Sequence, residues 1–322
     1  MASSIGATVR VYVLLDGFDL GVGILFAFAS EPNRRKMLSA ISPVWDGNET
    51  WLVVTGTVLF GAFPAAYAAL LSAFYLPLVV MLCSLILRGV AFEFRYKSVG
   101  FRWLWDLGFT GGSFVAAFVQ GMTVGALVEG LPMRGGHYVG GTLGWFSPFA
   151  VLCGLGLVLG YSLLGASWLV RKCEGPIRER AYLWLPVLTI SVLAFLACAF
   201  VAALVMHLDL MSRWLERPYL LIFPLIGAVS AYGLLKRVKQ RNDLAPFRLA
   251  SLIFIAAFGT LACSFWPFMI PFALTVDQAA SPPASLNFMF WGAGLFVMPL
   301  TLIYTAVVYR LFRGKVVEMD YE

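Results

Sequence analysis

The heptad Trp45-Asp46-Gly47-Asn48-Glu49-Thr50-Trp51 places polar side chains where a long apolar stretch begins. Polar groups near a bilayer core are costly, so they usually mark a proton or ion path, a ligand site or a subunit contact. The alternative is a helix start, with Asp46 as the N-cap and Glu49 completing a capping box. Ser42-Pro43 offers a second start, with Pro at the first helical position. The chemical and capping interpretations are compatible.

Two aspartates, Asp16 and Asp19, lie inside an earlier apolar stretch. Their spacing of three puts them on one helix face. Each costs about 2.5–3.5 kcal/mol at a helix centre on insertion scales, so each needs a partner, a proton or water. Gly17 and Gly21 form a small-xxx-small pair, which predicts close packing of another helix. The glycines are not a dinucleotide fingerprint, because no βαβ context surrounds them.

Arg88 lies within a third apolar stretch, and Glu93 lies near its end. We expect Arg88 to be buried and paired with Asp16 or Asp19, because a buried charge needs a partner. The alternative is that Arg88 extends to the membrane interface. Glu93 should lie at the level of Asp46, and its alternative role is a surface pair with Lys97.

Composition indicates the elements that carry these residues. Of 322 residues, 61% are hydrophobic and 12% charged, against about 25% charged in soluble domains. The mean hydropathy is +0.86. The chain is therefore predicted to be an all-α polytopic membrane protein, a single transmembrane domain over residues 1–322. With about 20 residues per crossing, nine spans are expected: 7–29, 48–73, 76–94, 107–130, 146–170, 182–207, 218–235, 247–272 and 288–311.

The distribution of Lys and Arg predicts the orientation. Loops after odd-numbered spans carry 18 of the 23 basic residues, and the opposite side carries four, Arg10, Arg134, Arg213 and Arg217. Cytoplasmic loops are the basic ones, so the N-terminus should be outside and the C-terminus in the cytoplasm. Because the basic residues fall in short loops, the net charge of +6 does not indicate nucleic-acid binding. No small-residue cleavage site is apparent, so the first span should remain.

Cofactor ligands are scarce. The two histidines, His137 and His207, fall at the outer ends of spans, and no second ligand is suggested opposite either one. Haem needs an axial ligand, usually His or Met. The five cysteines have no CxxC spacing, so no metal site is expected. We expect no haem, metal or catalytic residue in this chain.

Several motifs together resemble subunit II of the cytochrome bd quinol oxidases, over nearly the whole chain. They are Asp16 to Gly23, Pro43 to Trp51, Arg88 with Glu93-Phe94-Arg95, Trp105-Asp106, Gly112 to Phe114, and Phe265 to Pro271. The lead-in before Asp16 departs from the family, because it is short and polar. We therefore expect either that the outer half of the first span frays or that the start of the chain differs from the one usual in the family.

The resemblance implies a bacterial inner-membrane complex that oxidises quinol and reduces dioxygen to water. Subunit I would hold haems b558, b595 and d, and this chain would be its partner, with two four-helix bundles plus one peripheral helix. Asp46 and Glu93 would belong to a cytoplasmic proton path. A structural quinone and a small accessory subunit occur in some members. We expect Trp45, Asn48 and Trp51 to contact subunit I or a quinone.

Two other functions remain as alternatives. A secondary transporter would use buried Asp and Arg residues to bind a substrate or a coupling ion, and such folds often have broken helices in both halves. Here the buried charge is concentrated in the first three spans, which favours one part of a larger redox complex. A purely structural partner of subunit I would share the same fold.

Overall fold

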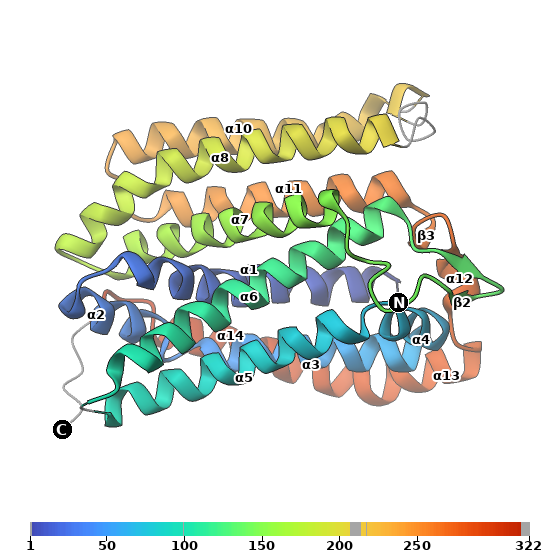
Figure 1. The fold of residues 1–322 in the computed structure, drawn as a ribbon, viewed down its shortest axis with the longest axis horizontal. Helices are drawn as coiled ribbons and strands as arrows, with labels where there is room; N and C mark the ends of the chain where they lie inside the picture. Colours follow the sequence, from blue (N-terminus) through green and yellow to red (C-terminus); the bar gives the residue numbers. More distant parts are fainter. Residues whose placement is uncertain (1, 99, 207–213, 217, 317–322) are drawn as a thin grey trace.

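The computed structural model describes residues 2–98, 100–206, 214–216 and 218–316. His207, Arg213 and Arg217 lie outside these ranges. The described part is a set of long, roughly parallel and antiparallel helices (Figure 1). It confirms the predicted all-α architecture.

The first half of the chain forms the helices that carry the polar motifs. These are α1 (Ala2–Leu25), α2 (Glu31–Ile41), α3 (Trp45–Ala62), α4 (Pro64–Ala73), α5 (Tyr75–Lys97) and α6 (Arg102–Glu129). A short 3-10 turn, Phe26–Phe28, follows α1. The helix α1 is regular from Ala2, so the predicted fraying of its outer half is wrong. The side chain of Arg10 contributes there, because its Nε donates to the Gly6 carbonyl at 2.8 Å.

The second half forms a similar group of helices. It contains α7 (Pro148–Lys172), α8 (Pro176–Met206), α10 (Ile222–Lys239) and α11 (Ala245–Phe265), with a 3-10 turn at Pro218–Leu221. It is followed by α12 (Val276–Ala279), α13 (Pro283–Phe288), a π-helical turn (Met289–Gly294) and α14 (Leu295–Leu311). Contacts join α1, α3, α5 and α6 in one group and α7, α8, α10 and α11 in another. None of the α14 residues is fully buried, as expected for a peripheral helix.

Seven of the described helices are long and apolar enough to cross a membrane. An eighth crossing results if α13 and α14, which are bent by 42° where they meet, form one span. The remaining predicted span, 48–73, is folded as α3 and α4. The two helices are separated at Phe63 because Pro64 begins the second one, and a proline inside a helix kinks or breaks it.

Two short hairpins lie together at one end of the helices. Strand β1 (Met133–Arg134) pairs with β2 (His137–Tyr138), and β3 (Phe268–Ile270) pairs with β4 (Leu274–Thr275), both antiparallel. The second hairpin follows the end of α11 at Phe265, so this helix ends before residue 272, the predicted end of the span. Figure 1 shows both hairpins at the end from which α1 starts.

The two helix groups meet along α7, which packs on both α6 and α1. A Cβ atom added at Gly21 would lie 1.7 Å from the Tyr161 carbonyl oxygen, and one at Gly17 would lie 2.6 Å from the Tyr161 ring. Only glycine permits this approach, which confirms the predicted small-xxx-small contact. Next to it, Phe18 stacks on Trp168 with ring centroids 4.2 Å apart. The contact therefore fixes the depth of Asp16 and Asp19 between the groups.

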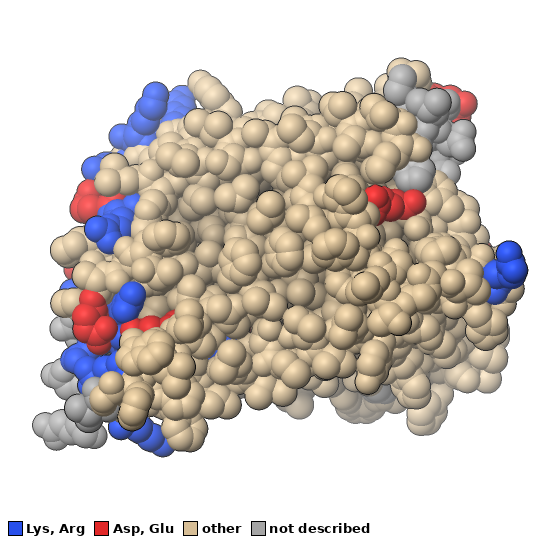
Figure 2. Space-filling view, in the orientation of Figure 1, with Lys and Arg blue, Asp and Glu red and all other residues tan. Residues whose placement is uncertain are grey.

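Charge is strongly separated along the helix axes. Most Lys and Arg side chains gather at one end of the molecule (Figure 2). We call this the basic end. It contains α2, the α5–α6, α7–α8 and α10–α11 connections and the residues that follow α14. The hairpins lie at the opposite end. The positions predicted for the inner loops are thus together at one end of the described structure.

Candidate functional site

The start of α3 differs from both capping interpretations. Its N-cap is Val44, and no side chain caps the helix. Asp46 lies inside the first turn, where its carbonyl accepts a hydrogen bond from the Thr50 hydroxyl at 3.0 Å. Ser42 is the C-cap of α2, so the predicted start at Ser42-Pro43 is also wrong. Ser42 cannot start α3 because α2 extends to Ile41, through residues that we expected to form a loop. The acids of the heptad are therefore free for other contacts.

Asn48 is the centre of the heptad's buried contacts. Its side-chain Nδ2 donates to Asp19 Oδ2 at 2.6 Å and to the Leu15 carbonyl at 3.2 Å. Its Oδ1 accepts a hydrogen bond from the Tyr309 hydroxyl at 2.9 Å. The amide thus joins α1, α3 and α14, and its hydrogen bonds define which atom is oxygen. Asp19 itself is fully buried.

Arg88 on α5 joins the acids of α1 and α3. Its side chain is 1% exposed, and its Nη1 lies 2.6 Å from Glu49 Oε1 and 3.9 Å from Asp16 Oδ1. The guanidinium also lies over the rings of Trp45 and Phe109, at 5.9 and 5.8 Å. The structure thus places Arg88 in the core with Asp16, as expected, and not at the interface. Glu49 is the closer partner, and the sequence analysis missed this role.

A second set of polar groups continues from Asp16 toward the opposite end. Gln120 of α6 donates from Nε2 to the Tyr12 hydroxyl and accepts from the Tyr161 hydroxyl, both at 2.8 Å. Tyr12 lies four residues before Asp16, one helical turn away on α1.

We refer to Asp16, Asp19, Asn48, Glu49 and Arg88 as the acidic cluster. It holds three carboxyls and one guanidinium between the two ends of the helices.

Asp46 and Glu93 lie on α3 and α5, the helices that carry Glu49 and Arg88. Both side chains are exposed. The residues directly before them, Trp45 and Phe92, pack together with ring centroids 5.1 Å apart, so the start of α3 lies beside the last third of α5. In the described part of the chain Glu93 has no ion pair with Lys97. The exposed acids are therefore separate from the buried ones, Asp46 at the start of α3 and Glu93 near the end of α5.

The three residues expected to contact subunit I or a quinone differ in how much of each is exposed. Trp51 is 0% exposed and Asn48 is 1% exposed. A side chain without exposed surface cannot touch a partner, so the prediction is corrected for these two residues. Trp45 is half-buried. It retains surface for such a contact, which stays a prediction.

The basic end holds two further ion-pair networks. Arg95 bonds Asp106, and its Nη2 lies 2.7 Å from Glu31, while Arg34 lies 2.8 Å from Asp106. These contacts tie α2 to α5 and α6. Asp106 lies beyond the first turn of α6, where it joins Arg34 and Arg95 in one network.

The second network fastens the residues after α14. Asp243, in the α10–α11 connection, accepts hydrogen bonds from Arg178 at 2.8 Å, Lys315 at 2.7 Å and Tyr182 at 2.6 Å. Lys315 also donates to the Val170 and Cys173 carbonyls at 3.0 and 3.1 Å. Burial alone would raise the pKa of Asp243, but these hydrogen bonds outweigh it and lower the pKa to about 2. We call these contacts the tail latch.

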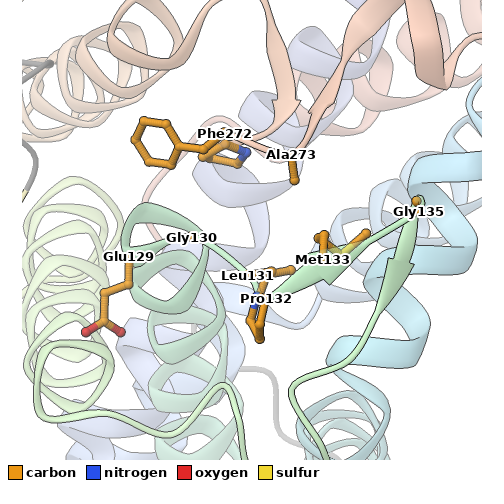
Figure 3. Close-up of a pocket in the computed structure, with 10 residues that line it drawn as sticks. Glu129, Gly130, Leu131, Pro132, Met133, Gly135, Phe272 and Ala273 are labelled. Atoms are coloured by element: carbon orange, nitrogen blue, oxygen red, sulfur yellow. The ribbon is translucent and has the colours of Figure 1, made fainter.

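A pocket at the opposite end lies beside the hairpins. Glu129, Leu131, Pro132 and Phe272 are among its lining residues. In Figure 3 the Glu129 side chain points away from the other labelled residues, and it accepts a hydrogen bond from the Ser147 hydroxyl. The pocket thus lacks a free acid directed into it.

The two histidines of the chain are its candidate haem ligands. His137 is exposed in β2, and His207 lies outside the described residues. Within the described ranges, no group of three or more His, Cys, Asp or Glu side chains could hold a metal ion. The buried polar groups of the acidic cluster are joined by ion pairs and hydrogen bonds.

The fold and the acidic cluster define a multi-pass membrane protein with a buried charge network between its helices. Comparison identifies the family: the family described as cytochrome bd terminal oxidase subunit II matches residues 1–312, and the chain belongs to it. The complexes of this family are quinol oxidases with haem cofactors, and subunit II is partnered by subunit I. The comparisons give no support to the transporter alternative.

Curated relatives agree. The chain is 31% identical to the cytochrome bd-I ubiquinol oxidase subunit 2 of Escherichia coli K12, covering 99% of this chain and 94% of that one. It is 29% identical to the cytochrome bd ubiquinol oxidase subunit 2 of Bacillus subtilis 168, covering 95% and 92%. A chain of the solved bd oxidase from Geobacillus thermodenitrificans shares the fold, with a TM-score of 0.79 at 16% identity and 97% coverage of both chains.

Proposed function

We propose that this subunit conducts protons from the cytoplasm toward the site of dioxygen reduction in the complex. The observation that carries the proposal is the acidic cluster. Asp16, buried to 1% exposure, lies within ion-pair distance of Arg88, and Arg88 pairs with Glu49, three residues after the exposed Asp46. Protons cross a low-dielectric region through acids, hydroxyls and water, and ionisable groups at membrane depth usually mark such paths.

Asp46 and Glu93 are proposed as the entrance of this path. Both are exposed carboxyls, and the Trp45–Phe92 contact brings their helices together. Two carboxylates near one opening attract protons from the surrounding water, and each can release a proton inward. Arg88, Asp16 and Asp19 would then set the charge inside, where a proton entering the bundle meets the first buried acids.

We propose that the basic end faces the cytoplasm. The charge separation along the helices supports this orientation, because Lys and Arg are retained on the inner side of the membrane. Single cysteines placed at Lys239 and Gln278, both exposed and at opposite ends, should label from opposite sides of sealed vesicles in a cysteine-free background. The cysteine at position 239 should label from the cytoplasmic side. Labelling of both cysteines from the same side would refute the proposed topology.

We further propose that haems b558, b595 and d and the quinol-oxidising site belong to subunit I. The exposed position of His137 and the lack of a ligand group in the described residues support this division. A structural quinone would find surface at Trp45, which is half-buried. A small accessory subunit would add to this pair.

The test is Asp46→Asn in the assembled complex. Asn replaces Asp well in helix-start roles, and Val44 is the N-cap, so structure should be retained. The complex should keep its haems, and oxygen consumption should fall at least several-fold. Glu93→Gln should act in the same direction. Wild-type turnover with normal proton uptake in both variants would refute the proton path.

A further inference from the structure

Glu49 lies between the exposed entrance and the buried acids. It follows Asp46 by three residues on α3, so the two side chains share a helix face. The Asp46 side chain is exposed, the Glu49 side chain is 28% exposed, and the Asp16 side chain is 1% exposed. Exposure thus falls in steps along three successive carboxyls. This arrangement leads inward from the surface of the subunit.

The carboxyls of Glu49 and Asp16 both lie close to the same nitrogen of Arg88. Arg88 Nη1 lies 2.6 Å from Glu49 Oε1 and 3.9 Å from Asp16 Oδ1. The two oxygens can therefore be no farther apart than these distances laid end to end. Because O–H···O bonds span about 2.7–2.8 Å, one or two water molecules can connect them. Arg88 itself does not release a proton, since a guanidinium stays charged in proteins. It can only position the two carboxyls.

The charges of the cluster are unbalanced. Three buried or half-buried carboxyls, Asp16, Asp19 and Glu49, face a single guanidinium among the described residues. The other titratable groups packed around them are Tyr12, Asp46, Tyr161 and Tyr309. Fully ionised, the three carboxyls and Arg88 would leave two uncompensated negative charges in a low-dielectric interior, which is strongly unfavourable. The cluster therefore favours binding of protons over full ionisation.

We propose that Glu49 is a proton carrier between Asp46 and Asp16. The inference rests on the proton path proposed above and adds a residue to it. In each transfer Asp46 gives its proton to the Glu49 carboxylate and is reprotonated from the cytoplasmic side. Glu49 then passes the proton through water to Asp16. Once ionised again, it restores the ion pair with Arg88. No bond other than O–H forms or breaks, and no oxidant or reductant is needed.

The alternative for Glu49 is a purely structural counter-ion of Arg88. The structural role and the carrier role predict different effects of the substitution Glu49→Gln. Glu49→Gln keeps the length of the side chain and an oxygen that accepts from Arg88, but it cannot carry a proton. Glu49→Asp keeps the acid and shortens the side chain. A structural counter-ion would affect assembly and leave the turnover of assembled complexes unchanged, whereas a carrier would affect turnover and its pH profile.

The experiment compares Glu49→Gln, Glu49→Asp and Asp46→Asn in the complete complex with subunit I, reconstituted in vesicles. Haem content, oxygen consumption from pH 6 to 9 and proton uptake are measured. The matched control is Glu179→Gln, since Glu179 is an exposed acid at the basic end that pairs with Arg241 outside the cluster. We expect Glu49→Gln to retain haem and turn over at least tenfold more slowly. Glu49→Asp should recover part of the rate with a shifted pH profile, and Glu179→Gln should behave as wild type.

The outcomes separate the two proposals. Wild-type turnover in Glu49→Gln together with slow turnover in Asp46→Asn would overturn the role of Glu49 and leave the entrance at Asp46 intact. Wild-type turnover in both variants would overturn the proton path itself. Should Glu49→Gln fail to assemble, Glu49→Asp decides: a shifted pH profile supports the carrier, and an unchanged rate and profile refutes it.

Discussion

Removal of Arg88 should destabilise the subunit more than any other single change in the acidic cluster. At an effective dielectric constant of about 20, attraction to Glu49 at 2.6 Å and to Asp16 at 3.9 Å corresponds to ~6 and ~4 kcal/mol before desolvation. Desolvation of three charges offsets much of this, and Glu49 is partly screened by water. The measurable loss for one missing partner of a buried pair is about 3–5 kcal/mol.

Arg88→Met is the suitable perturbation, because methionine fills a similar length beside Trp45 and Phe109 without charge. We expect lower yield of assembled complex, lower haem content per membrane protein and a reduced Tm of the purified complex. Adding Glu49→Gln or Asp16→Asn should recover part of the loss, because each removes a carboxylate left without its cation. The matched control is Arg88→Met with Glu93→Gln, since Glu93 is an exposed acid on the same helix.

The reasoning fails if Arg88→Met assembles with the wild-type yield and Tm. It also fails if the Glu93→Gln control restores stability as well as Glu49→Gln does. In that case overall charge, and not the pairing seen in the structure, would set stability.

Two further predictions concern positions outside the cluster. Gly21→Ala should lower the Tm or abolish assembly, because its Cβ would meet the Tyr161 backbone at 1.7 Å, whereas Gly111→Ala, with nothing within 4 Å, should be neutral or slightly stabilising. Asp243→Asn should cost roughly 1–2 kcal/mol at neutral pH after screening by water. The pKa of Asp243 is lowered to about 2, so the tail latch contributes fully above the unfolded pKa of about 3.9 and is lost as pH falls toward 2. The Tm difference between wild type and Asp243→Asn should therefore be constant from pH 6 to 8 and shrink below about pH 4. A gap that widens in acid would contradict this origin.

Local sequence features predicted the buried acids well. The i,i+3 spacing of Asp16 and Asp19 and the cost of an unpaired charge were enough to predict burial and a partnership of Arg88 with α1. Glu49 was missed because an acid in the first turn of a helix is usually explained by capping and the helix dipole. Its spacing of three from Asp46 was the available signal. The sequence reasoning also missed α2, although Pro32 at its start was a signal, because Arg34 and Arg35 were attributed to a loop.

Other parts of the site could not be predicted from local patterns. The bond from Tyr309 to Asn48 joins residues 261 positions apart, and no periodicity within either helix indicates it. The burial of Asn48 and Trp51 likewise depends on how α14 and α1 pack on α3. Such contacts follow from tertiary arrangement, which propensity and spacing do not determine.

The Tyr309–Asn48 hydrogen bond has a consequence for biogenesis. Asp19 and Asn48 belong to helices that are made early, but the hydroxyl that completes their arrangement is in α14, which follows every other described helix in the chain. Until α14 arrives, the Asn48 oxygen must be satisfied by water or lipid headgroups, a costly state for a buried amide. A nascent chain halted before α14 would thus expose a polar defect that membrane quality-control proteases can recognise. The hydrogen bonding of the buried Asn48 side chain is therefore complete only once Tyr309 of α14 has been made and packed beside it.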